Sequence, residues 1–310
     1  MFLKRGWKEF PESVLAIGFF DGLHLGHRRV LAEAYHRATS CTPLCVVTFY
    51  PHPQHLLSPR RKIKYLTLYG EKYLLLSRFY PGIFLSFLRF GENLRRTSPL
   101  AFLGRIEEVF HPRVICVGEN FRFGFGRQGN PELLRKYFAP RGVDVVALPS
   151  YQVGGEVVSS SRIREYLLLG ELERANALLG SPFSVIGKVR KGRRIGRALG
   201  FPTLNLYPPS VKLLPPPGVY VGSVSWEGNS NSAFQALVYT GTRPTFRDTK
   251  RQVVEVFVPH SSFPELYNRR VCITFEHFVR KEMVFPSEEA LKAQVQRDIE
   301  TFFLLSRDDR

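Results

Sequence analysis

The stretch Ala16–Leu31, AIGFFDGLHLGHRRVL, decides the fold expected for this chain, because it contains a strand, a turn and the start of a helix. Gly18 and Gly22 lie in the turn, and glycine lets a backbone approach a ligand closely. His24 and His27 stand three residues apart, so a helix would carry both on one face beside its unpaired N–H groups. Because a helix N-terminus also carries positive potential, we expect nucleotide phosphates to bind here. Two histidines on the surface of an ordinary helix are the alternative.

Apolar runs alternate with helix-length segments from residue 14 to about residue 180. The runs are nearly continuous in apolar residues, which is typical of strands that are buried on both faces. This alternation predicts an α/β domain with a doubly wound parallel sheet, Rossmann-like, whose ligands bind at the carboxyl ends of the strands. The expected strands are Val14–Phe19, Leu44–Phe49, Ile83–Phe90, Val114–Val117 and Val143–Leu148.

The pattern changes near residue 181, where a helical segment ends and short strands begin to alternate with Gly- and Pro-rich turns. We expect a small antiparallel β-barrel or sandwich here, followed by a C-terminal helix with Ser287 as its N-cap. The sequence therefore predicts two domains, residues 1–181 and 182–310. The strands expected in the second are Phe183–Val189, Val219–Ser225, Phe234–Tyr239, Val253–Val258 and Val271–Glu276.

The composition is strongly basic: the 310 residues include 44 Lys and Arg against 27 Asp and Glu, for a formal net charge of +17. Such a chain favours a polyanionic partner, either nucleic acid, a membrane surface or a phosphorylated small molecule. The basic residues are spread along the chain, whereas nucleic-acid readers gather them in one stripe or tail. No run approaches the roughly 18 apolar residues of a membrane span, and the four cysteines show no Cys-x-x-Cys spacing. We therefore expect a cytoplasmic protein that binds neither nucleic acid nor a membrane.

Two further stretches of the first domain carry groups that suit a nucleotide. The loop VGENFRFG, residues 117–124, brings Asn120 and Arg122 to the end of a predicted strand, where an amide can read a base edge. Three serines at residues 159–161 begin a predicted helix with Arg164 behind them, and hydroxyls, helix N–H groups and a guanidinium all donate to one anion. Helix capping alone explains one of these serines. The histidine turn and this serine cluster are two separate phosphate-binding groups, which together indicate a triphosphate ligand.

The loop after Asn120 continues into Gly124-Phe-Gly126-Arg-Gln-Gly129, which formally matches the dinucleotide fingerprint G-x-G-x-x-G. The fingerprint requires its first glycine in the turn directly between a strand and a helix. Here the first glycine comes about seven residues after the strand, so we do not expect a dinucleotide loop.

The second domain contains a glycine-rich basic loop, Gly192–Gly200, followed closely by Thr203 and Asn205. A hydroxyl and an amide carbonyl beside nucleotide phosphates are oxygen ligands that suit Mg²⁺, so Thr203 and Asn205 are candidate metal ligands. A solvated turn is the alternative. Glu255 lies within an apolar strand, where a half-buried carboxylate either faces the polar side or serves as a general base.

In this order, the motifs resemble those of the bifunctional riboflavin kinase/FMN adenylyltransferases, the prokaryotic FAD synthetases, over nearly the whole chain. The stretches GFFDGLHLGH, TFYPHP, VGENFRFG and VSSSRIR resemble the nucleotidyltransferase half. The stretches GRALGFPTLN, TGTRPTF, ELYN and FVRKE, together with Glu255, resemble the kinase half. The chain departs from the family's usual residues in the second half at Tyr239, Glu265, Asn268 and Lys281.

The resemblance implies two ATP-dependent reactions: phosphorylation of riboflavin to FMN, and adenylylation of FMN to FAD with release of pyrophosphate. In the adenylyltransferase half, His24 and His27 would stabilise the ATP phosphates. Ser160 and Arg164 would hold the phosphates from the opposite side, and Asn120 would contribute to the substrate pocket.

In the kinase half, the resemblance implies that Thr203 and Asn205 bind Mg²⁺ and an ATP phosphate, while Glu255 takes the proton of the ribityl 5′-hydroxyl. The expected partners are ATP, riboflavin and FMN/FAD, and self-association is left open. An adenylyltransferase with a weak or inactive kinase domain is one alternative, and a basic nucleic-acid-binding protein is another. The residues expected to contact nucleotide or flavin are Gly18, Phe20, Asp21, Gly22, Asn120, Arg122, Gly192, Arg197, Gly200, Pro202, Thr203 and Asn205.

Overall fold

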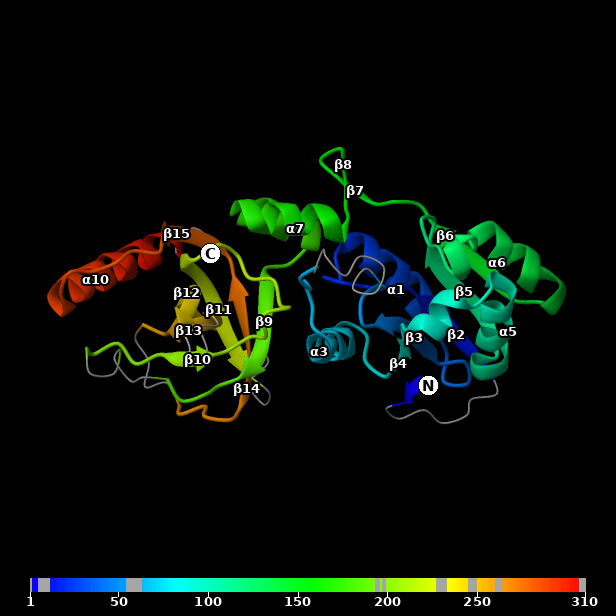
Figure 1. Ribbon diagram of the computed structural model, residues 1–310, viewed down its shortest axis with the longest axis horizontal. Coiled ribbons are helices and arrows are strands. Elements are labelled where there is room, and N and C mark those ends of the chain that lie inside the picture. The colour runs from blue at the N-terminus through cyan, green and yellow to red at the C-terminus, as the bar shows by residue number, and fades with distance from the viewer. Residues whose placement is uncertain are drawn as a thin grey trace. The chain divides into compact units, whose positions relative to one another are not determined.

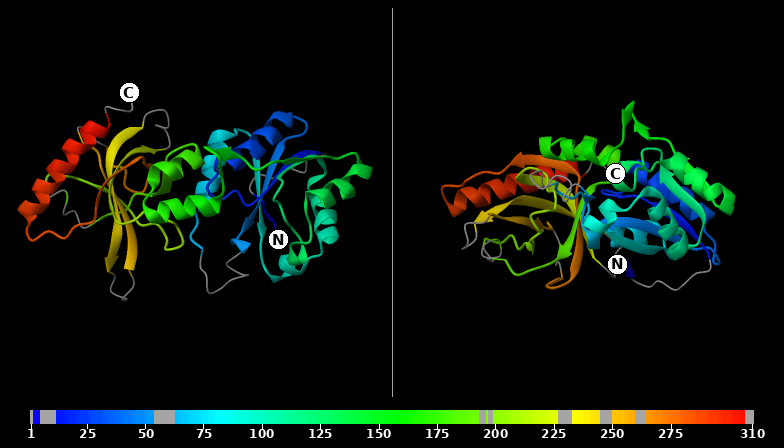
Figure 2. Two further views of the ribbon diagram at one scale, coloured as in Figure 1. Left: turned by 90° about the horizontal axis from the view of Figure 1, so that it is seen from above. Right: turned by 45° about the vertical axis from the view of Figure 1, so that its right-hand side comes forward.

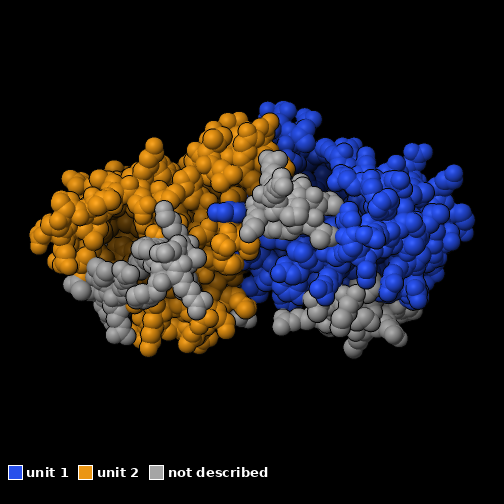
Figure 3. Space-filling view, viewed as in Figure 1, with its two compact units in different colours: residues 1–160 blue, residues 161–310 orange. Residues whose placement is uncertain are grey.

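The computed structural model describes residues 2–4, 12–53, 63–192, 196, 199–226, 233–244, 250–259 and 264–306. The chain divides into two compact units, Met1–Ser160 and Ser161–Arg310 (Figure 3). This division lies before the domain boundary that we placed at residue 181, so the two divisions assign residues 161–181 differently. The boundary at residue 181 stays a prediction.

The first unit is built on a six-stranded sheet with the strand order β1-β4-β3-β2-β5-β6. Strands β2 to β6 run parallel, and β1 pairs antiparallel with β4 at the edge. All five strands expected from the apolar runs are present, which confirms the doubly wound α/β arrangement. The strands are β1 (Phe2–Lys4), β2 (Ser13–Ile17), β3 (Leu44–Tyr50), β4 (Phe84–Arg89), β5 (Pro112–Gly118) and β6 (Asp144–Leu148).

Helices cover both faces of this sheet (Figure 1), because its central strands are apolar on both sides. Residues of α1 and α3 share one buried cluster with strand residues such as Val14 and Val46. Residues of α5 and α6 share the other cluster with strand residues such as Leu15 and Val47. The helices are α1 (Leu25–Arg37), α3 (Tyr69–Phe79), the short α4 (Glu92–Arg96), α5 (Pro99–Phe110) and α6 (Pro131–Phe138). A small hairpin of β7 (Gln152–Val153) and β8 (Glu156–Val157) follows β6.

The second unit contains a curled antiparallel sheet with the order β10-β13-β12-β11-β14-β9, and β15 also pairs with β11 (Figure 2). The five strands expected here are present, and two further strands, β10 and β15, were not expected. The strands are β9 (Phe183–Lys188), β10 (Leu204–Leu206), β11 (Gly218–Trp226), β12 (Phe234–Pro244), β13 (Lys250–Phe257), β14 (Arg270–Phe275) and β15 (His277–Lys281). Helices α7 (Ser160–Leu169), α8 (Leu172–Leu179) and α10 (Glu288–Leu305) complete the unit.

The C-terminal helix α10 begins as predicted. The Ser287 hydroxyl accepts a hydrogen bond from the Ala290 N–H at 3.2 Å, which caps the helix. Phe302 on the same helix is buried against Val219 and Leu237 of the sheet. This contact confirms that an apolar face of α10 packs on the β-sheet of the second unit.

Two features of the structure bear on the cysteine content and the apolar composition of the chain. Cys45 and Cys116 are buried in strands, and burial raises the pKa of the Cys116 thiol to about 12. Among the residues that the structure describes, no helix combines the length and the apolar composition needed to cross a bilayer.

Candidate active sites

The histidine turn of the first unit lies between β2 and α1, at the carboxyl end of the parallel sheet. His24 is the N-cap of α1, and its Nδ1 accepts a hydrogen bond from the His27 N–H at 3.3 Å. The two imidazole rings stack, with centroids 3.5 Å apart and planes 17° apart. A neutral imidazole that accepts at Nδ1 carries its proton on Nε2, so His24 has a second nitrogen that can donate to an anion. His24 thus precedes the helix as its cap rather than lying within it, and the stacking places both imidazoles together at the helix start.

The backbone of this turn takes an unusual path. Phe20, Gly22 and Leu23 have φ values of 50°, 88° and 47°, in the left-handed region that favours glycine. For Phe20 and Leu23 this costs about 1–3 kcal/mol each, so the surrounding contacts must hold the turn in place. Gly18 is needed for another reason, because a Cβ there would lie 2.8 Å from the Phe20 ring. Phe20 itself is buried and forms an edge contact with the His27 ring.

Asp21 holds the turn from inside the protein. Its carboxylate is fully buried and accepts hydrogen bonds from the Leu66 N–H at 3.1 Å and the Thr67 N–H at 2.8 Å. It also accepts one from the Thr67 hydroxyl at 3.0 Å, and that same hydroxyl accepts a bond from the Gly22 N–H. The Asp21 carboxylate therefore ties the turn to the segment before α3.

The serine cluster meets the histidine turn. The Ser160 hydroxyl donates to the Asp21 backbone oxygen at 2.8 Å, across 139 positions of sequence. The structure thus brings Ser160 together with Asp21 and the adjoining histidines. Arg164 is half-buried one helical turn further along α7, in the stretch assigned to the second unit.

The loop after β5 places Asn120 and Arg122 at the carboxyl edge of the first sheet, with both side chains exposed. The Asn120 Nδ2 donates to the Ser150 hydroxyl at 2.9 Å, and Arg122 donates to the backbone oxygens of Glu119 and Phe121. Ser150 donates its N–H and its hydroxyl to the Glu119 carboxylate, which lowers the pKa of Glu119. Hydrogen bonds thus fix the shape of this predicted substrate loop.

The G-x-G-x-x-G match in the following loop is a packing feature. A Cβ at Gly124 would lie 2.7 Å from the Pro99 side chain, and one at Gly129 would lie 2.4 Å from the Phe123 ring. Phe123 and Gly129 form a backbone bridge rather than a strand-to-helix turn. The expectation that this loop is not a dinucleotide fingerprint agrees with its geometry.

A cavity of about 440 Å³, which no sequence motif indicated, opens at the carboxyl end of β4. Its wall combines an apolar floor with polar and basic groups from β4, α4 and α5. The lining residues are Leu88, Arg89, Asn93, Leu94, Thr97, Ala101, Phe102, Arg105 and Ile106.

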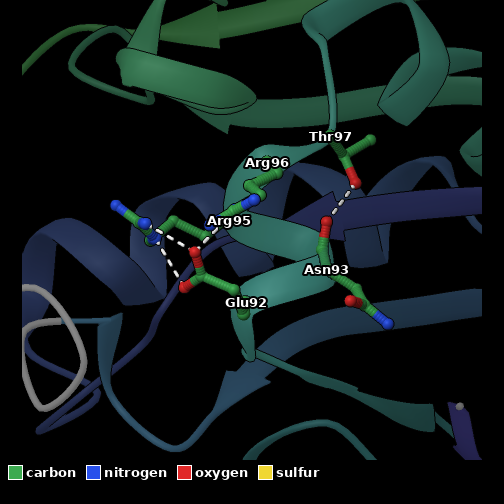
Figure 4. A network of polar contacts seen from close by, with 5 residues as sticks. All are labelled: Glu92, Asn93, Arg95, Arg96 and Thr97. Carbon is green, nitrogen blue, oxygen red and sulfur yellow. Dashed lines mark hydrogen bonds and ion pairs between the residues drawn. The ribbon is translucent and has the colours of Figure 1, made fainter.

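Helix α4 borders this cavity and is held by its own ion pairs (Figure 4). The Glu92 carboxylate accepts from Arg95 at 2.6 Å and from Arg96 at 2.7 Å, and these bonds lower the pKa of Glu92 to about 2. The Thr97 hydroxyl donates to the Asn93 backbone oxygen at 2.8 Å and closes the helix. The basic residues near the cavity thus differ in role: Arg95 and Arg96 pair with Glu92, whereas Arg89 and Arg105 belong to the cavity wall.

In the second unit, strand register joins two candidate residues that lie far apart in sequence. Asn205 on β10 and Tyr239 on β12 both stand directly opposite Glu255 on β13. Residues directly opposite in antiparallel strands point to the same face of the sheet. The Asn205 Nδ2 donates to the Thr203 backbone oxygen at 3.2 Å and to its hydroxyl at 3.3 Å. Thr203, Tyr239 and Glu255 line a cavity of about 350 Å³.

The glycine-rich loop before Thr203 is partly described. A Cβ at Gly192 would lie 2.6 Å from the Asn205 side chain, so glycine is required for the loop to pass beside it. Gly200 has φ of 90°, and Pro202 is exposed. Arg197, which we expected to contact nucleotide, lies outside the described residues.

Several polar residues of the 350 Å³ cavity were not singled out from the sequence. The Tyr239 hydroxyl donates to the Glu282 carboxylate, and Gly241 leaves room for that hydroxyl. Arg280 donates to both oxygens of the buried Asp298 carboxylate on α10, at 2.8 Å each. Arg280 and Glu282 belong to the stretch FVRKE, so the family motif was the available signal, but their partners could not be identified from it.

Comparison with known proteins identifies what these sites belong to. Residues 7–162 match the family model for FAD synthetase, and residues 179–303 match that for riboflavin kinase. The bifunctional riboflavin kinase/FMN adenylyltransferase of Listeria monocytogenes is 32% identical over 289 residues, which cover 92% of this chain and 90% of the relative. That of Escherichia coli strain K12 is 33% identical over 300 residues, with the same coverage. The chain belongs to this family.

A bifunctional riboflavin kinase/FMN adenylyltransferase makes FAD in two steps, and this chain has both activities. It phosphorylates riboflavin to FMN and adenylylates FMN to FAD, with ATP as the co-substrate of both families.

The fold agrees with a solved structure described as a macrolide-efflux protein from Streptococcus pneumoniae, with a TM-score of 0.78, 26% identity and coverage of 94% of each chain.

The close approach of Gly192 to Asn205 leads to a prediction. In Gly192→Ala, the new Cβ must displace Asn205 from its place beside Glu255. Because small misplacements in an active site can cost on the order of 100-fold in rate, we expect riboflavin phosphorylation to fall at least about tenfold. FMN adenylylation by the same preparation should be unchanged, and Gly91→Ala, whose Cβ would meet nothing within 4 Å, serves as control. Equal phosphorylation by Gly192→Ala and the unaltered chain would contradict this account.

Proposed function

We propose that FAD formation takes place at the N-terminus of α1, with His24 and His27 against the phosphates of ATP. The observation that carries this assignment is the stacked histidine pair at the cap of a buried, carboxylate-anchored turn. In this proposal an FMN phosphate oxygen attacks the α-phosphorus of ATP, and the bond to pyrophosphate breaks. The imidazoles and the α1 N–H groups stabilise the negative charge that develops on the phosphates. Ser160 adds its hydroxyl to this site, and the role of Arg164 in holding the phosphates stays a prediction.

We assign the 440 Å³ cavity at the end of β4 to the FMN that accepts the adenylyl group. Its volume lies within the range of small-molecule sites, about 300–1,000 Å³, and its apolar floor suits a flavin ring. Arg89 and Arg105 in its wall supply positive charge for an anionic substrate. Asn120, at the same edge of the sheet, would contribute to the adjoining substrate loop.

For riboflavin phosphorylation we propose Glu255 as the general base. The strand register supports this role, because it aligns Glu255 with Asn205 beside the cavity that Thr203 also lines. Glu255 accepts the proton of the ribityl 5′-hydroxyl as that oxygen attacks the γ-phosphorus and ADP leaves. The apolar part of the wall, including Phe257 and Phe285, suits the flavin.

Thr203 and Asn205 fit the Mg²⁺ expected in this unit. The Asn205 amide nitrogen donates to Thr203, which leaves the amide oxygen as an acceptor, and this oxygen and the Thr203 hydroxyl would be the two ligands of Mg²⁺. When bound, Mg²⁺ neutralises charge on the ATP phosphates. A cytoplasmic location and self-association of the chain stay predictions.

The histidine assignment is tested by His27→Ala. Because the imidazole stabilises charge in the transition state, FAD formation from FMN and ATP should fall on the order of 100-fold. Riboflavin phosphorylation should not change. The control is His36→Ala, which removes an exposed imidazole near the other end of α1. Product analysis by chromatography measures both reactions, and normal FAD formation by His27→Ala would refute the assignment.

The flavin cavity is tested by filling it. Ala101 lines the cavity, whereas its neighbour Leu100, which is also exposed, does not. In Ala101→Trp, the indole should occupy space needed by FMN and raise the KM for FMN at least about tenfold, which corresponds to about 1.4 kcal/mol of binding. The KM for ATP should stay near its original value. If Leu100→Trp raises the KM for FMN as much as Ala101→Trp does, the cavity is not the flavin site.

The general base is tested by Glu255→Gln, which keeps the size of the side chain but cannot accept the proton. We expect riboflavin phosphorylation to fall by a factor of about 10²–10⁴, with FMN adenylylation unchanged. Glu300→Gln, at an exposed position on α10, should leave both rates unchanged. Retention of full phosphorylation in Glu255→Gln would exclude Glu255 as the base.

A further inference from the structure

Lys72 is a buried lysine directly behind the histidine turn. It lies in the first turn and a half of α3, its side chain is 3% exposed, and its Nζ donates to the Phe19 backbone oxygen at 2.6 Å. The Thr48 hydroxyl on β3 lies 3.3 Å from the same nitrogen and itself donates to the Phe19 oxygen at 2.9 Å. The Lys72 nitrogen also lies 4.5 Å from the centre of the Phe19 ring. All of these contacts converge on the first residue of the turn.

The position of Lys72 is costly for an ammonium group. Burial lowers the pKa of Lys72 to about 8, while the nearby charge of Asp21 acts in the opposite direction. An apolar side chain could fill the same space without burying a charge. The contact with the Phe19 backbone oxygen is therefore the feature that can explain why a lysine is buried here.

That group is the start of a strained segment. The left-handed residues Phe20, Gly22 and Leu23 follow Phe19 directly and lead into the His24 cap. Asp21 ties the middle of this segment to Thr67, and the amine fixes its beginning. Both anchors come from the same short stretch of chain before and within α3, so they act on the turn together.

We propose that Lys72 is a positioning residue for adenylyl transfer, which fixes the Phe19 carbonyl and thereby the turn that carries His24 and His27. This inference rests on the function proposed for the histidine turn. Lys72 touches no reacting atom in this account. Its effect reaches the reaction through the placement of the two imidazoles, because misplacement of such groups by a fraction of an ångström lowers the rate.

The first measurement compares Lys72→Met with Lys136→Met in the full chain. Methionine keeps much of the length and volume of the buried side chain but has no donor, and Lys136 is exposed on α6. For Lys72→Met we expect kcat/KM for FAD formation from FMN and ATP to fall by about 10- to 100-fold. Riboflavin phosphorylation should change by less than about twofold, as should both reactions in Lys136→Met. An unchanged rate of FAD formation in Lys72→Met would overturn the inference.

A double-mutant cycle with His27→Ala separates positioning from a general loss of folded enzyme. If Lys72 acts through the histidines, Lys72→Met should slow a His27→Ala enzyme by a smaller factor than it slows the unaltered chain, because one of the two imidazoles it positions is already gone. Slowing by the same factor in both backgrounds would overturn the inference. If His27→Ala alone forms FAD normally, the proposed role of His27 fails, and the rate of Lys72→Met alone still decides whether the lysine matters.

Thermal unfolding followed by circular dichroism shows whether the variants are folded. If Lys72→Met does not fold, Lys72→Gln, which retains an N–H donor without the charge, enters the same cycle. Should the first unit fail to fold with either side chain, Lys72 is required by the fold itself and a positioning role is overturned.

Discussion

The first unit depends on one buried carboxylate. Asp21 accepts hydrogen bonds from two consecutive backbone N–H groups and one hydroxyl in the segment before α3, and it does so with no exposure to water. In a region of low dielectric constant such bonds are strong, and an unmade one would be expensive. The carboxylate therefore offsets the strain of a turn that holds two bulky residues in left-handed conformations. Without that turn, β2 could not deliver a helix N-terminus to the edge of the sheet with His24 as its cap.

The second unit positions its candidate residues in a different way. Its candidate groups lie on strands rather than on a turn, and register alone puts Asn205, Glu255 and Tyr239 in one row. Rigid strands place functional groups more accurately than loops do. The rim of the cavity is completed from β15 and α10, where Arg280 and Asp298 form a buried ion pair. In both units, buried polar contacts therefore hold the candidate residues in place beside the site.

The sequence predicted most of what local patterns determine. Continuous apolar runs identified the five central strands of the first sheet, and Ser287 identified the start of α10. Strand β10 was missed because three residues are too few for a period, and β15 because His277–Lys281 is largely polar.

Long-range polar contacts could not be predicted in the same way. The contact of Asp21 with nucleotide stays a prediction, and nothing in the sequence indicated that its carboxylate also binds Leu66 and Thr67, about 45 positions away. No local pattern indicates such a pairing, nor the placement of Lys72 under Phe19. The cavity at the end of β4 was hidden for the same reason, because its wall combines a strand end with two helices. Family motifs marked several residues that lie at the histidine turn or in the wall of a cavity, without indicating which of them face solvent.

The antiparallel register of the second unit sets different tolerances for two kinds of evolutionary change. The row opposite Glu255 accommodates the large side chain of Tyr239, because Gly241 leaves room for its hydroxyl. A change in the number of residues in β13 would have an all-or-none effect instead. Insertion or deletion of one residue within β13 would turn Glu255 to the opposite face of the sheet and move its neighbours with it. Along this strand, substitutions at positions other than Glu255 can have graded effects, whereas a change in the number of residues reverses the direction of every side chain that follows.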